Sequence, residues 1–233
     1  MPRLRWSPVS FRLNQFLAHS LLLALVSCQP SSNSPKDAFE SFEHAWKTGD
    51  MASLDSLVDA DTREYFNALQ PWIIVGNEES LTSLNPFDRY LVLLIRMHLD
   101  SLSNSDWESR LERLQSGDSV NALDDYLVEL LEESFFRTSL GEIDSYAGIT
   151  AGPLYRIGVE TGLRVRFKKE KTWKVDLKNF FQNQFQQELK PYLSDRYKNR
   201  DRVWEMLRDK YGERMSFELR RSRVARHGDD ATN

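Results

Sequence analysis

The chain has 233 residues, of which 40% are hydrophobic, 12% aromatic and 28% charged, and its formal net charge is −4. This composition is typical of a globular protein with a hydrophobic core, and it excludes collagen-like and low-complexity chains. The mildly acidic balance also argues against non-specific nucleic-acid binding, which needs a basic surface. We therefore expect no nucleic-acid partner.

The N-terminal segment has the three parts of a secretory signal peptide. Residues 1–15 carry arginines and no acidic residue, residues 16–27 are mostly apolar, and the small residue Ser27 comes last. A charged region, an apolar region and a small-residue cleavage site define such a peptide. The apolar run is shorter than the roughly 20 residues that a membrane-spanning helix needs. We predict a signal peptide over residues 1–27, cleaved after Ser27.

Cys28 is the single cysteine of the chain and ends the sequence "LVSC". This sequence resembles the lipobox of bacterial lipoproteins. The resemblance implies that Cys28 Sγ receives a diacylglycerol, that cleavage precedes Cys28 and that the new amino group is acylated, typically with palmitate. A thiolate is the nucleophile that this chemistry needs, and two or more acyl chains anchor a protein stably. The alternative is an incidental cysteine after an ordinary signal peptide.

The location follows from the same resemblance. Gln29 stands where enteric lipoproteins retained in the inner membrane have aspartate, which implies an outer-membrane anchor facing the periplasm. Because no other cysteine exists, we expect neither disulfides nor thiolate metal sites in the exported body. Residues 28–34 read as a lipid-anchored polar tether, residues 35–219 as a single domain, and residues 220–233 as a disordered tail.

The first half of the body is predicted to be helical. Ser34 and Gly49 have the residue types that begin and end a helix, and Asp50 can cap the next one. A third helix is expected to end before Pro71. After Asn85-Pro86, a helix that is apolar nearly all round is expected to be buried. Further amphipathic helices are predicted at 105–116 and 120–135.

After Gly141 the hydrophobic period changes from helical to alternating. Strands are predicted at about 143–150, in "LYRIGVET" (154–161), and in an antiparallel hairpin over 163–177 whose apolar face is buried. In the hairpin, Trp173 is expected to be buried. Two helices, around residues 180–190 and 203–211, are predicted to follow.

Two stretches resemble lipoproteins with a nuclear-transport-factor-2-like domain. They are "SPKDAFESFEHAWKTGDMASLDSLV" (34–58), with a first helix that ends at "GD", and "LRVRFKKEKTWKVDL" (163–177), with a basic turn before a tryptophan strand. The resemblance implies a curved antiparallel sheet wrapped by helices around a cone-shaped cavity. We therefore predict an α+β fold with N-terminal helices, a curved antiparallel sheet (strands about 143–177) and C-terminal helices.

The sequence contains none of the common nucleotide-binding, serine-hydrolase or zinc-protease motifs. We therefore predict no catalytic residue, no metal ligand and no cofactor. Several side chains have a possible functional reading beside a more ordinary structural one. These are His44 and His98; the acidic pairs Asp59/Asp61, Asp124/Asp125 and Glu132/Glu133; the basic residues Lys168, Lys169 and Lys171; Arg220, Arg221, Arg223 and Arg226; and the aromatic stripe Phe39, Phe42 and Trp46.

Two functions remain open from the sequence. The favoured one is a non-enzymatic envelope lipoprotein that is held at the membrane by lipid on Cys28 and binds a small ligand or an envelope protein. The alternative is an isomerase- or cyclase-like enzyme with a buried carboxylate in a cone-shaped cavity. A buried, isolated carboxyl group beside a tyrosine hydroxyl would favour the enzyme, and an apolar pocket or a filled core would favour binding.

Overall fold

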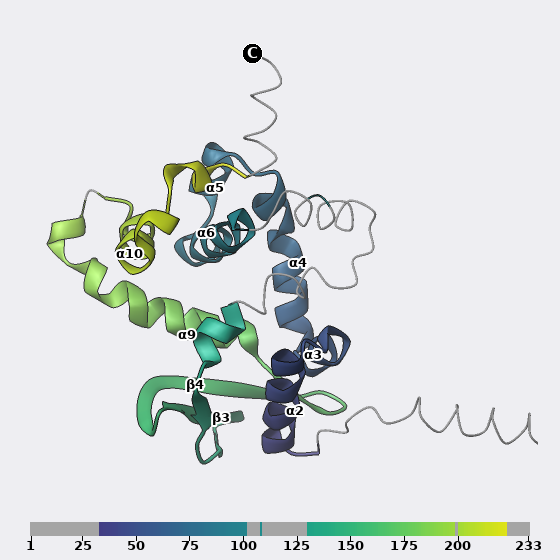
Figure 1. Ribbon diagram of the computed structural model, residues 1–233. Coiled ribbons are helices and arrows are strands. Elements are labelled where there is room, and N and C mark those ends of the chain that lie inside the picture. Colours follow the sequence, from purple (N-terminus) through teal and green to yellow (C-terminus); the bar gives the residue numbers. More distant parts are fainter. Residues whose placement is uncertain (1–32, 102–107, 109–129, 199, 223–233) are drawn as a thin grey trace, which may run out of the picture.

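The computed structural model describes residues 33–101, 108, 130–198 and 200–222 (Figure 1). The predicted lipidation and cleavage site at Ser27 and Cys28 lies outside this part of the chain. The described residues form N-terminal helices, a curled antiparallel sheet and C-terminal helices, so the predicted α+β class is confirmed. The main helices are α2 (Pro35–Thr48), α3 (Met51–Leu57), α4 (Ala60–Ile74), α5 (Glu78–Ser83), α6 (Pro86–Asp100), α9 (Leu177–Leu189) and α10 (Arg202–Tyr211).

The first two helices begin and end where the sequence predicts. The Ser34 side chain accepts from the backbone N–H of Asp37, whose carboxylate accepts in return from the N–H of Ser34. Gly49 ends α2 with a φ of 69°, a left-handed conformation that glycine adopts without strain. Asp50 then caps α3 through the N–H of Ser53.

The predicted end of α4 before Pro71 is wrong, because the helix continues to Ile74. Pro71 is on the exposed side of the helix, whereas Leu69 and Ile73 are buried in the core on either side of it. Their packing maintains the helix across a residue that cannot donate its own hydrogen bond. The guanidinium of Arg96 on α6 also donates to the carbonyls of Trp72 and Gly76 at the end of α4.

The sheet has the order β1-β3-β4-β5, and β2 pairs with β3 beside β1. Its strands are β1 (Thr138–Leu140), β2 (Asp144–Tyr146), β3 (Ile149–Arg156), β4 (Val159–Lys169) and β5 (Trp173–Val175). The predicted hairpin is β4 and β5. The stretch "LYRIGVET" was predicted as one strand, which is wrong, because Ile157 and Gly158 form the turn between β3 and β4 with φ angles of 53° and 78°. β1, which precedes Gly141, was not predicted.

An irregularity in β4 curls the sheet. The pairing of β3 with β4 shifts between Pro153 and Tyr155, and the extra residues on β4 include Gly162, whose φ is 74°. The hydroxyl of Thr161 fills the gap by donating to the carbonyl of Leu154 at 2.9 Å. A bulge of this kind bends a strand and increases its twist.

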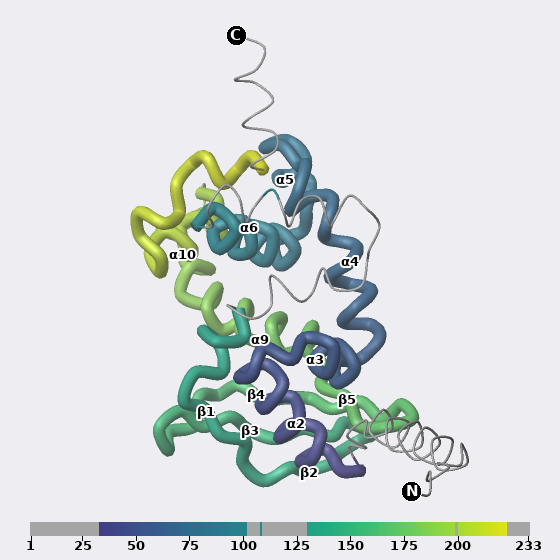
Figure 2. Tube along the Cα trace, turned by 45° about the vertical axis from the view of Figure 1, so that its right-hand side comes forward, coloured from purple at the N-terminus to yellow at the C-terminus, as the bar shows by residue number. Residues whose placement is uncertain are grey.

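The helices form two layers over the sheet (Figure 2). α2, α3 and α9 pack directly against the strands, and α4, α6 and α10 lie beyond them. Phenylalanines fill the space between the layers: the ring centroids of Phe66 on α4 and Phe181 on α9 are 6.1 Å apart, and those of Phe87 on α6 and Phe185 on α9 are 5.7 Å apart. α6 is buried on nearly all sides, as predicted. The buried side chains of both layers form one continuous hydrophobic core.

Two predicted details differ from the structure. Trp173 is only partly buried, because it lies at the outer end of β5 opposite Lys169, whose Nζ is 5.1 Å from the ring centroid. The folded body also continues past Leu219. Ser222 is fully buried, and its N–H donates to the carbonyl of Gly76 at 3.0 Å.

Candidate functional site

The acidic pair Asp59/Asp61 and the basic residue Lys168 meet at one cluster. Lys168 Nζ on β4 lies 2.8 Å from Asp59 Oδ1, 2.9 Å from Asp61 Oδ2 and 3.3 Å from Asp176 Oδ2. Asp59 is fully buried and Asp176 is 3% exposed. Burial alone would lower the pKa of Lys168, but its hydrogen bonds with Asp59 and Asp61 and the charge of Asp176 outweigh burial and raise it.

This cluster has a structural role in the described fold. Asp59 caps α4 through the N–H and hydroxyl of Thr62, and Asp176 caps α9 through the N–H of Asn179. Lys168 therefore ties the beginnings of two helices to strand β4. The carboxylate oxygens are occupied by these contacts, so neither buried aspartate is isolated in apolar surroundings.

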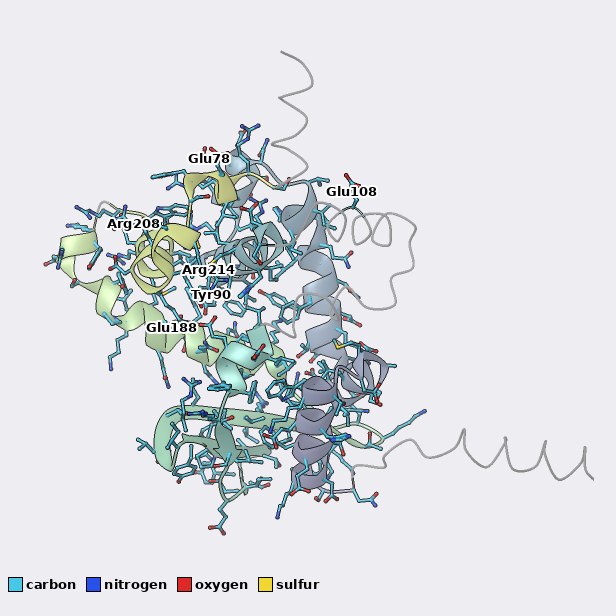
Figure 3. The ribbon with its side chains drawn as sticks, viewed as in Figure 1. Glu78, Tyr90, Glu108, Glu188, Arg208 and Arg214 are labelled. Carbon is cyan, nitrogen blue, oxygen red and sulfur yellow. The ribbon has the colours of Figure 1, made fainter. Side chains whose placement is uncertain are left out.

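A second polar cluster, which the sequence did not predict, joins α6, α9 and α10. Lys210 Nζ bridges Glu133 and Glu188 at 2.9 and 2.8 Å. The hydroxyl of Tyr211 donates to Glu133 at 2.6 Å, and that of the fully buried Tyr90 donates to Glu188 at 3.1 Å. Figure 3 labels Tyr90 and Glu188. Of the predicted pair Glu132/Glu133, only Glu132 is on the exposed face that we expected.

The ionisable groups of this second cluster are also held by hydrogen bonds and ion pairs. Burial alone would raise the pKa of Glu133, but the hydrogen bonds from Tyr211 and Lys210 outweigh it and hold the pKa below its usual value. Burial, and then the charge of Glu188, raise the pKa of Tyr90 well above its usual value. A carboxylate with a lowered pKa is a poor general base near neutral pH, so the cluster is better suited to holding the helices together.

A groove between α2 and the segment 138–143 differs from both clusters because its floor is apolar. We call it the α2–β1 groove; its volume is about 640 Å³. Phe39 of α2, Leu140 of β1 and Ile143 form its floor and pack against the core. Its charged rim consists of Lys36, Glu40, Glu43 and Glu142.

Two glycines shape this groove. A Cβ on Gly152 of β3 would lie 2.9 Å from Leu140 Cδ1 and 3.1 Å from Ile143 Cγ1, so the glycine lets both side chains lie close to the strand. A Cβ on Gly141 would lie 2.6 Å from the Tyr155 ring. Within the described residues β1 and β2 pair only with β3. The groove therefore opens along an edge of the sheet that no described strand covers.

The remaining predicted side chains are dispersed. His44 is exposed on α2, and His98 is buried at the end of α6, where its charge helps to lower the pKa of Glu133. Lys169 and Lys171 are exposed beside the β4–β5 turn, and Arg220 pairs with Glu78 at 2.8 Å. Of the aromatic stripe, Phe42 and Trp46 are core residues, while Phe39 belongs to both core and groove. Asp124, Asp125, Arg223 and Arg226 lie outside the described residues.

Residues 33–101, 108, 130–198 and 200–222 contain no group of three or more histidine, cysteine, aspartate or glutamate side chains that could hold a metal ion. None of the helices in these ranges is long and apolar enough to cross a bilayer.

Comparisons with protein-family models, with curated proteins and with solved structures found no match to this chain.

Proposed function

We propose that this chain is a lipid-anchored envelope protein whose domain binds the apolar part of a small ligand in the α2–β1 groove. The anchor is the lipid expected on Cys28, and an outer-membrane position facing the periplasm is part of the proposal. The observation that supports binding is the floor of Phe39, Leu140 and Ile143 beneath an open cavity of about 640 Å³. Ligand sites in proteins are typically concave, mostly apolar and of about this size, roughly 300–1,000 Å³.

The rim of the groove favours a neutral or cationic ligand. Three carboxylates, on Glu40, Glu43 and Glu142, stand beside one lysine, Lys36. Lys36 lies 3.8 Å from Glu40, and Glu43 is paired with Lys47 at 2.6 Å. Glu142 is exposed at the opposite side of the groove. An apolar body with a neutral or positively charged end would match this arrangement.

The contrast with the enzyme alternative rests on the buried carboxylates. An isomerase- or cyclase-like base needs a carboxyl group in apolar surroundings with a raised pKa. Among the described residues the buried carboxylates are Asp59 and Asp176, and both lie within 3.3 Å of Lys168 Nζ. Glu133 has a lowered pKa. The geometry therefore supports binding better than catalysis.

Binding is tested with N-phenyl-1-naphthylamine, a neutral apolar probe whose fluorescence rises when it leaves water. We expect Ile143→Trp, which fills the groove, to weaken probe binding by at least about fivefold, equivalent to about 1 kcal/mol. Val159→Trp is the matched control, because Val159 is 69% exposed at the start of β4, opposite Arg156 at the far end of β3. Equal binding by both variants would show that the groove is not the site.

The anchor is tested separately by intact-mass measurement of the membrane-associated protein. We expect the mature chain to begin at Cys28 and to carry the mass of a diacylglycerol and a fatty acid. Cys28→Ser should leave the precursor uncleaved and unacylated. An unmodified Cys28 on the membrane-associated native chain would refute the anchor without affecting the groove.

A further inference from the structure

Two hairpin turns at opposite ends of β3 expose apolar side chains. We call residues 146–149 the β2–β3 tip and residues 156–159 the β3–β4 tip. In the β2–β3 tip, Tyr146 is 84% exposed and Ile149 is 45% exposed, around a turn of Ala147 and Gly148 with φ angles of 51° and 80°. The β3–β4 tip has the same turn geometry and equally exposed apolar side chains. The two tips differ in their positions relative to the N-terminus and in the residues around them.

The β2–β3 tip is at the end of the sheet where α2 begins. The register pairs Thr150 with Phe167 and Phe167 with Val175, which places this tip beside the β4–β5 turn. Lys36, in the first turn of α2, lines the same groove as Ile143, the residue before β2. Figure 2 shows the start of α2, β2 and the β4–β5 turn on the same side of the molecule.

The length of the tether limits how far this end can stand from the lipid. Five peptide steps separate Cys28 from Asn33, the first described residue, and they span at most about 18 Å when fully extended. A domain anchored through Cys28 must therefore keep the start of α2 close to the bilayer surface. The β3–β4 tip lies at the other end of β3.

We propose that the β2–β3 tip lies in the headgroup region of the bilayer, so that the domain contacts lipid directly as well as through its anchor. This inference rests on the proposed lipidation of Cys28. Tyrosine has an apolar ring with a polar end and is enriched at membrane interfaces. Ile149 adds apolar area next to it, and the exposed amines of Lys169 and Lys171 on the adjacent turn can reach lipid phosphates.

Two acidic groups that flank the tip and the adjacent turn are paired with protein groups. Asp144, two residues before Tyr146, is paired with Arg164 at 2.8 Å. Glu170, in the β4–β5 turn, accepts a hydrogen bond from the N–H of Ala60 at 3.1 Å. Both carboxylates are directed toward protein partners. They therefore do not neutralise the amines of Lys169 and Lys171, which remain exposed at the β4–β5 turn.

The experiment uses the full mature lipoprotein in vesicles of phosphatidylethanolamine and phosphatidylglycerol. Cys28 is the single cysteine of the chain, so once its sulfur carries lipid, an introduced cysteine is the one thiol free for labelling. A polarity-sensitive fluorophore is attached to Tyr146→Cys or, as the control, to Val159→Cys. We expect the label at position 146 to gain at least about twofold in intensity and to be quenched by spin-labelled lipid, and the label at 159 to do neither.

The outcomes separate the two proposals. Equal responses at both positions, or no response at 146, with Cys28 shown by mass to be lipidated, would overturn the tip contact and leave the anchor intact. An unmodified Cys28 would overturn both, because the tether argument would then have no attachment point. A response at 146 that disappears in Ile149→Ser, with the circular dichroism spectrum unchanged, would show that the apolar side chains make the contact.

Discussion

Replacing Lys168 by methionine tests whether the cluster around it holds the fold together. Methionine keeps much of the length and apolar volume of the side chain but removes the charge. Asp59, fully buried, and Asp176, 3% exposed, then lose the ammonium group that lies 2.8 and 3.3 Å from their oxygens. Asp59 would remain buried without a matching cation, while Asp176 would keep Arg166, whose Nε lies 3.9 Å from its Oδ2.

The expected cost follows from this geometry. Removing one partner of a buried ion pair destabilises a protein by about 3–5 kcal/mol. The side chain of Lys168 is 29% exposed, and each aspartate retains its helix-cap hydrogen bonds, so we expect the lower end, about 3 kcal/mol. A loss of this size is a large share of the roughly 5–15 kcal/mol that stabilise a typical domain.

Urea denaturation of the mature chain, followed by circular dichroism, measures this change. Lys169→Met is the matched control: it is the same substitution on the next residue, and its side chain is exposed beside Trp173. We expect the control to cost at most about 1 kcal/mol. Asp59→Asn in the Lys168→Met background should recover part of the loss, since asparagine still caps a helix but carries no charge. If the two lysine variants had equal stability, the role assigned to Lys168 would be wrong.

Three further predictions concern the second cluster, the hairpin and the groove. The pKa of Glu133 is held below its usual 4.5, so the stability that its ionised form contributes is present above pH 4.5 and is lost as the pH falls through the lowered pKa. The loss in free energy of unfolding caused by Lys210→Met should therefore be smaller at about pH 3 than near pH 7. An equal loss at both pH values would contradict this. Trp173→Ala should cost about 1–2 kcal/mol in urea denaturation rather than the roughly 3–5 kcal/mol of a fully buried tryptophan, and the larger loss would show that the ring is more buried than described. Gly152→Ala places a Cβ 2.9 Å from Leu140 Cδ1 and should destabilise the chain by about 1–3 kcal/mol while weakening probe binding, whereas unchanged stability and binding would show that the groove floor adapts.

Local signals in the sequence predicted much of the fold. Caps such as Ser34 and Asp50, the stop at Gly49 and the alternation in β4 act between near neighbours, so one sequence is enough to find them. The failures came from tertiary packing or from unusual backbone. Pro71 is tolerated because core residues on either side of it hold α4 together. Ile157 adopts a positive φ, which a β-branched residue rarely does, so the turn before Gly158 was not recognised.

The candidate sites were less predictable because their members are distant in the sequence. Lys168 and Asp59 are 109 residues apart in the sequence. A lysine or an aspartate in a sequence does not show which distant residue it will pair with. The same is true of the groove, where Phe39 on α2 meets Ile143 beside β2. Phe39 was expected in the core, and its second role at the groove has no sequence signal. A glycine within an alternating strand, such as Gly152, indicates that other groups can lie close to the strand. It was the one sequence signal for the groove.

The central claim, that the groove holds the ligand of a lipid-anchored protein, is tested most directly by native mass spectrometry of the chain purified from its own envelope. We predict a lipidated mature chain that carries an additional bound species, which is retained in Val159→Trp and absent in Ile143→Trp. A native chain with no bound species, or a species that remains in Ile143→Trp, would contradict the claim.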